Sequence, residues 1–89
     1  MFGRGDIMKS YTEHKSWQNF AHNVKWLRSH YEFSKEKMAK ILGISVDMLK
    51  EIENNEIPID LTVEVIPNIS KFFLVEPQDL MRIHLDKKS

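Results

Sequence analysis

The pattern that sets the architecture of this chain lies in residues 33–54, which read FSKEKMAKILGISVDMLKEIEN. Ser34 and Ser45 each stand directly before a run with apolar residues at helical spacing, and serine is a favoured cap for the first amide groups of a helix. Gly43 falls between the two runs, where glycine can end a helix in the left-handed conformation without strain. The stretch therefore predicts a helix of about two turns, a three-residue turn and a second helix over about 45–54.

A further helix is expected on the amino-terminal side. Ser16 can cap it, and its apolar residues recur at steps of three and four, which is typical of one helical face. These residues are Phe20, Val24, Leu27 and Tyr31. Residues 1–15 hold two glycines, scattered charges and no apolar period, so they are expected to form a flexible arm.

Two more helices are expected on the carboxyl-terminal side. The apolar face of the first is formed by Val65, Ile66, Ile69, Phe72 and Phe73. Pro67 leaves its start open, because a cap at Thr62 would put the proline beyond the first turn and kink the helix, whereas a start after Ile66 would make Pro67 a harmless first residue. The last helix is expected to begin at Pro77, with Asp79 favourably placed in its first turn.

The length of the chain indicates one domain, and the five expected helices make it an all-α domain, a compact five-helix bundle over residues 16–85 with a tail over 86–89. The chain has 89 residues, enough for a single core. It lacks cysteine, which excludes a disulfide scaffold and suits a reducing cytoplasm. No apolar run approaches the length of a membrane span, so we expect a cytoplasmic protein without a membrane partner.

Charge and catalytic residues narrow the function classes. The chain has 13 basic and 13 acidic residues, so it lacks the basic surplus that is usual in a DNA-binding protein. No nucleophile, base and acid can be grouped into an active site, and no glycine-rich phosphate loop is present, so an enzyme is not expected. The four histidines have no close metal-ligand spacing, and we expect neither a metal nor a cofactor. They are His14, His22, His30 and His84.

The order of residues from Phe33 to Ser45, followed by Leu49, Ile52, Glu53 and Asn54, resembles the Cro and phage-repressor family of helix-turn-helix regulators, also called the Xre family. The resemblance covers about residues 20–82. It implies a lambda-repressor-like domain that binds double-stranded DNA as a homodimer and acts as a transcriptional repressor. The helix over about 45–54 would then lie in the major groove.

The resemblance also implies roles for single residues. It makes Ala39 and Gly43 structural, and it pairs Arg28 with Glu53 in a salt bridge between two helices. The expected DNA contacts are Ser34, Lys35, Lys40, Ser45, Val46, Asp47, Lys50, Glu51, Asn54 and Asn55. The helix that would enter the groove is acidic, and Glu51 stands where a basic or small polar residue is common in the family.

A second function class therefore stays open. The same fold can serve mainly to bind a protein partner, as an antitoxin-like module with weak DNA binding. Exposed tryptophans are typical of protein interfaces, and Trp26 falls between two inward-facing positions. The apolar surface for a dimer is expected either around Leu80, Met81 and Ile83 or around Trp17 and Trp26.

Overall fold

A computed structural model describes residues 4–58 and 60–87, and the side chains from residue 15 onward within those ranges. Over these residues the chain is all-helical, with five α-helices, one 3-10 turn and no strand, as the sequence predicts. The elements are α1 (Arg4–His30), α2 (Lys35–Leu42), α3 (Val46–Glu53), α4 (Val65–Phe73), α5 (Pro77–Arg82) and the 3-10 turn η1 (Leu85–Lys87). None of the described helices is long and apolar enough to cross a membrane.

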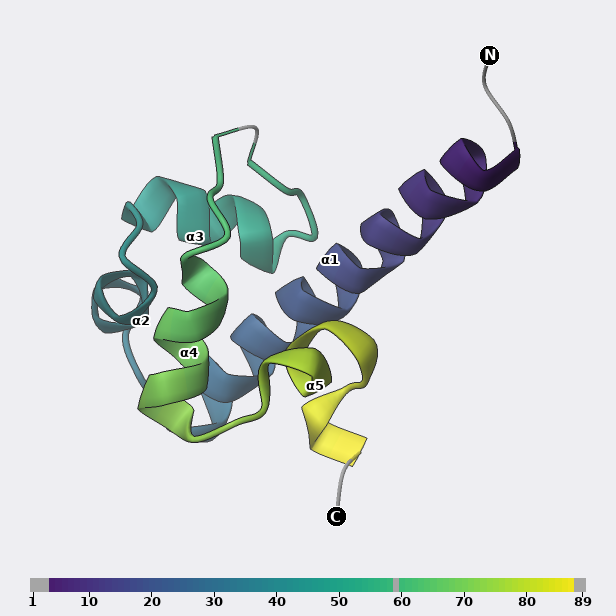
Figure 1. Cartoon of the computed structure of the whole chain (residues 1–89). Helices are drawn as coiled ribbons and strands as arrows, with labels where there is room; N and C mark the ends of the chain where they lie inside the picture. The colour runs from purple at the N-terminus through teal and green to yellow at the C-terminus, as the bar shows by residue number, and fades with distance from the viewer. Residues whose placement is uncertain (1–3, 59, 88–89) are drawn as a thin grey trace.

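The later part of α1 is the centre of the bundle. It contacts α3, α5 and η1, while α2 packs against α3 and α4 (Figure 1). Its inward face consists of fully buried side chains at helical spacing, which removes apolar surface from water and stabilises the fold. The buried apolar side chains of α1 are Phe20, Ala21, Val24 and Leu27.

The first helix begins earlier than the sequence predicts. Ser16 lies inside α1 and is not its cap, because the helix begins at Arg4. The expected irregular arm over 1–15 is thus helical from Arg4 onward, while residues 1–3 lie outside the described part. Apolar periodicity marks only the buried length of a helix, whereas the first turns of α1 project beyond the other helices (Figure 1). The helix ends at His30, so Tyr31 lies in the following turn and is 48% exposed.

The predicted caps of α2 and α3 are confirmed. The hydroxyl oxygens of Ser34 and Ser45 each accept a hydrogen bond of 3.1 Å, from the Lys37 and Met48 amides respectively. Gly43 ends α2 in the left-handed conformation, with φ 78°. These signals act over three or four residues, so they can be recognised without knowledge of the tertiary structure.

The start of α4 matches neither of the two predicted alternatives. The helix begins at Val65, and Pro67 is the third residue of its first turn. Amide groups of the first turn have no acceptor within the helix, so the missing N–H of proline breaks no bond there. Phe72 belongs to the predicted apolar face but is 51% exposed. Leu74 ends α4 in the left-handed conformation, with φ 57°.

The carboxyl-terminal elements close over α1. The last helix, α5, begins at Pro77 as predicted, and Leu80 is fully buried. Asp86 and Lys87, expected in an irregular tail, belong to η1, and residues 88 and 89 lie outside the described part.

Asn23, a buried residue of α1, holds the carboxyl-terminal segment against this helix. Its amide donates to the Leu80 and Ile83 carbonyls at 2.9 and 2.8 Å, and its oxygen accepts from the Leu85 amide at 2.8 Å. The residue is fully buried, so its polar atoms find their partners within the protein rather than in water. The backbone between Leu80 and Leu85 is therefore fixed against α1.

Candidate nucleic-acid interface

The turn between α2 and α3 is held in place by α4. The Asn68 side-chain amide donates to the Leu42 carbonyl at 2.8 Å. A Cβ atom at Gly43 would lie 3.2 Å from the same amide nitrogen, so a larger residue would press on this bond as well as strain the backbone. The relative orientation of α2 and α3 thus depends on contacts that a local sequence pattern does not include.

One face of α3 is buried and the opposite face is exposed. Leu49 and Ile52 are fully buried in the core. The exposed side chains lie at the spacing of a single helical stripe and are Asp47, Lys50 and Glu51, followed by Asn54 after the last turn. Val46, predicted with them as a DNA contact, is half-buried and packs against the core, so only part of it is accessible.

The salt bridge that the resemblance implies is present. Arg28 of α1 donates from Nε and Nη2 to the two carboxylate oxygens of Glu53 in α3, at 2.6 and 2.9 Å. Its Nη1 donates to the Phe33 carbonyl at 3.2 Å. The hydrogen bond with Glu53 raises the pKa of Arg28 above its usual value, against the opposing effect of burial. This paired geometry connects the end of α3 to the central helix.

A basic cavity of about 310 Å³ opens beside this pair. It brings together residues from α1, α2 and α3 and the position after α3: Lys25, Arg28, Lys35, Lys50, Glu53 and Asn54. Arg28 and Glu53 neutralise each other, so the three lysines give the basic cavity its positive charge. Lys25 is absent from the predicted contacts, although its position three residues before Arg28 places both on one face of α1.

The other predicted contacts lie outside the basic cavity. Ser34 and Ser45 are exposed caps, and Lys40 is exposed in the last turn of α2. The ammonium group of Lys37 lies 4.5 Å from the centre of the Phe33 ring, in a cation–π arrangement. Asn55, with φ 67°, takes the left-handed conformation after α3, whereas Asn54 does not.

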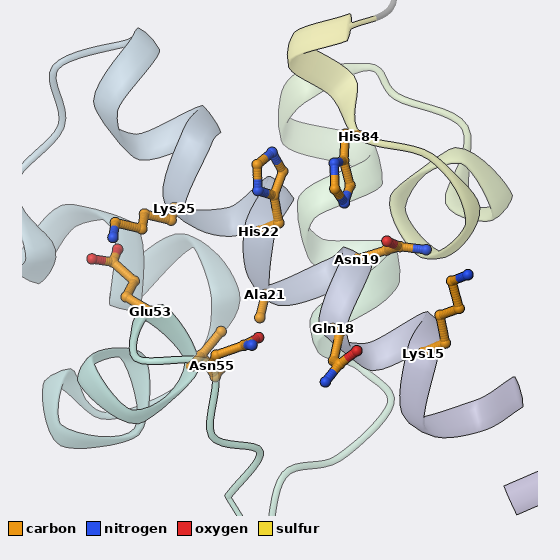
Figure 2. Close-up of a pocket in the computed structure, with 10 residues that line it drawn as sticks. Lys15, Gln18, Asn19, Ala21, His22, Lys25, Glu53, Asn55 and His84 are labelled. Atoms are coloured by element: carbon orange, nitrogen blue, oxygen red, sulfur yellow. The ribbon is translucent and has the colours of Figure 1, made fainter. Parts of the chain in front are cut away.

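A larger cavity of about 470 Å³ lies between α1 and the end of α3 (Figure 2). Its walls include Lys15, His22, Lys25 and Asn55, and His84 closes one side. His22 and His84, which have no close metal-ligand spacing in the sequence, face each other there with ring centres 3.9 Å apart. The sequence does not reveal this approach, because the two residues come from distant parts of the chain.

Comparison of the chain with protein-family models, with curated proteins and with solved structures finds no match to any of them. The geometry and charge of the residues described above are therefore the basis for assigning a function.

Proposed function

We propose that this protein is a helix-turn-helix transcriptional regulator that binds double-stranded DNA specifically, acts as a repressor and places α3 in the major groove as a dimer. The observation that carries the proposal is the basic cavity beside the exposed face of α3. Three lysines from three different helices converge there, next to side chains that project from one stripe of a capped helix. Phosphate contacts of this kind position a protein on DNA, and side chains on the neighbouring helix read the bases.

Each exposed residue of α3 has a plausible partner in the groove. Asp47 and Glu51 can accept a hydrogen bond from the amino group of cytosine, and Lys50 can donate to O6 or N7 of guanine. Lys35 lies at the start of α2, where free backbone amides also favour a phosphate oxygen. Recognition in this arrangement depends on few positive charges, which predicts weak nonspecific binding.

The charge of α3 favours one alternative, a module that binds a protein partner. Its exposed stripe has two carboxylates, Asp47 and Glu51, against one lysine, and carboxylates are repelled by DNA phosphates. A basic protein surface would complement this stripe better than DNA does. The two functions differ in what they require of the lysines in the basic cavity.

A selection of duplexes from genomic fragments, followed by binding measurements on the selected site, tests the proposal. Lys35→Ala and Lys50→Ala are each expected to weaken binding, and Lys35→Ala should lower the slope of log affinity against log salt by about one, because one phosphate contact is lost. Lys71→Ala, an exposed lysine on α4 outside the basic cavity, is the matched control.

The outcomes separate the two functions. The DNA-binding function is supported if an inverted repeat is enriched, if both cavity variants bind it less tightly, and if the control variant binds it like the unsubstituted protein. If no duplex is enriched, the partner-binding alternative replaces it. If a duplex is enriched but both cavity variants bind it like the unsubstituted protein, the basic cavity does not contact DNA and the proposed interface is wrong.

A further inference from the structure

We propose that His22, His84 and Asp86 form a binding site for a divalent transition-metal ion of the zinc class. One ligand atom from each of the three side chains lies within 4.8 Å of the other two. Two imidazoles and one carboxylate are a donor set that zinc accepts, with water completing a four-coordinate shell. The site is independent of the proposed DNA-binding function, because none of the three residues lines the basic cavity.

The backbone that holds the three ligands is already fixed. His22 directly precedes Asn23, whose buried side chain binds backbone groups of Leu80, Ile83 and Leu85. His84 and Asp86 flank Leu85, which is buried against the core. The two ligands on either side of Leu85 are thereby brought to the surface of α1 beside His22. Because this backbone is already ordered, little conformational entropy is lost when a metal ion binds, which favours the affinity for the ion.

Side-chain rotations and the movement of one proton separate the present arrangement from a coordinating one. His22 Nε2 lies 2.9 Å from Asp86 Oδ1, close to the roughly 3.3 Å between neighbouring ligand atoms of a tetrahedral zinc site. The two imidazole rings are stacked, with an interplanar angle of 20°. A metal ion lies in the plane of each ligating ring, so the stacked rings must turn apart. The proton that His22 donates to Asp86 must also leave Nε2, with Nδ1 carrying the proton of the neutral ring.

There is space and access for this rotation. His84 borders two cavities, of about 470 and 510 Å³, and it lies between α5 and η1 rather than inside a helix. The His22 and Asp86 side chains are 39% and 29% exposed, so an ion can reach them from solvent. Figure 2 shows the two rings side by side at the edge of the cavity of about 470 Å³.

The charges around the site set limits on its affinity. Basic side chains that line the two cavities oppose a cation, and these are Lys15, Lys25, Arg82 and Lys87. Salt screens exposed charges of this kind, so moderate ionic strength should not abolish zinc binding.

Calorimetric titration of the full chain, free of tags and of bound metal, with zinc chloride at neutral pH tests the proposal. We expect one ion per chain. His84→Ala and Asp86→Asn should each weaken zinc binding at least about tenfold. Loss of a residue that only hydrogen-bonds to a metal ligand commonly lowers metal affinity by about this factor, so loss of a ligand should lower it at least as much. His30→Ala is the matched control, since His30 also lies on α1 but stacks on Trp26 instead. Cobalt in place of zinc should give the visible absorption of a four-coordinate ion.

The alternative outcomes are distinct. Zinc binding that is equally tight in the unsubstituted protein, His84→Ala and Asp86→Asn would place the ion elsewhere and overturn the proposal. The absence of binding at about 1 mM zinc would also overturn it. Both variants change side chains outside the buried core, and circular dichroism of each metal-free variant checks that it remains folded. None of these results depends on whether the protein binds DNA.

Discussion

At the scale of the residue, the pair formed by Arg28 and Glu53 connects the helix proposed to read DNA to the helix at the centre of the bundle. The Glu53 side chain is only 6% exposed and that of Arg28 is 22% exposed. Their two parallel hydrogen bonds fix the end of α3 in both position and direction. The net stability of such a pair is small, but the loss of one partner leaves the other charge without compensation.

Glu53→Ala is therefore expected to lower the free energy of unfolding by about 1–3 kcal/mol, because Arg28 keeps only its bond to the Phe33 carbonyl. Denaturant unfolding measures the change. Glu51→Ala, an exposed glutamate on the same helix, should leave the stability nearly unchanged. Equal stability of the unsubstituted protein and Glu53→Ala would show that the pair contributes nothing to the fold.

At the scale of the element, short-range signals were sufficient for α2, α3 and the start of α5. Ser34, Ser45, Gly43 and Pro77 act within one helical turn, so their roles follow from the sequence alone. The start of α1 could not be predicted in this way, because its first turns continue the helix without contributing to the periodic buried face. Pro67 is tolerated for a reason that depends on where α4 begins, which the sequence leaves open.

The two candidate sites also differ in how far the sequence predicts them. Most of the basic cavity follows from the resemblance, which implies contacts at Lys35, Lys50 and Asn54 and pairs Arg28 with Glu53. The group of His22, His84 and Asp86 does not, because His22 and Asp86 are 64 residues apart. Only the folded arrangement of α1 and η1 brings them together.

The contact between α1 and the carboxyl-terminal segment leads to a prediction for Asn23. Asn23→Ala removes three hydrogen bonds, two of them fully buried, and is expected to lower the free energy of unfolding by about 2–4 kcal/mol. Asn19→Ala is the comparison, because Asn19 makes a single half-buried bond, to the Met81 carbonyl at 3.0 Å, and should cost about 1 kcal/mol.

Hydrogen exchange shows which part of the molecule the Asn23→Ala substitution destabilises. In Asn23→Ala the amides between Leu80 and Leu85 should exchange faster than those of α2, since only the former lose their connection to α1. Equal stability of the two asparagine variants would contradict the central role assigned to Asn23.

At the scale of the whole molecule, the proposed function requires two copies of a chain with zero net charge. A single recognition helix covers only part of one turn of the groove, so specificity comes from two half-sites roughly 34 Å apart. The structure shows which residues of the two predicted dimer surfaces are accessible to a second copy. Leu80 is fully buried and is unavailable to a partner, and Trp17 and Trp26 are half-buried against the core. Ile83, at 37% exposure, remains on the surface.

Sedimentation of the protein with a selected duplex should reveal two chains per duplex. Low net charge causes little repulsion between copies, which favours this association. A duplex with one half-site removed is the control, and it should bind much more weakly. A single chain bound per duplex, with equal affinity for both DNAs, would reject the dimeric repressor.

The hydrogen bonds between Asn23 and the carboxyl-terminal segment also affect the order in which contacts form during synthesis. These bonds join residues 57 to 62 positions apart, so α1 leaves the ribosome well before its partners exist. Until residues 80–85 emerge, the amide of Asn23 has only water to bind, and the side of α1 that α5 covers stays uncovered. Such distant contacts form late and slowly compared with those inside a helix. The nascent chain therefore exposes an apolar surface of α1 for the time needed to add these residues.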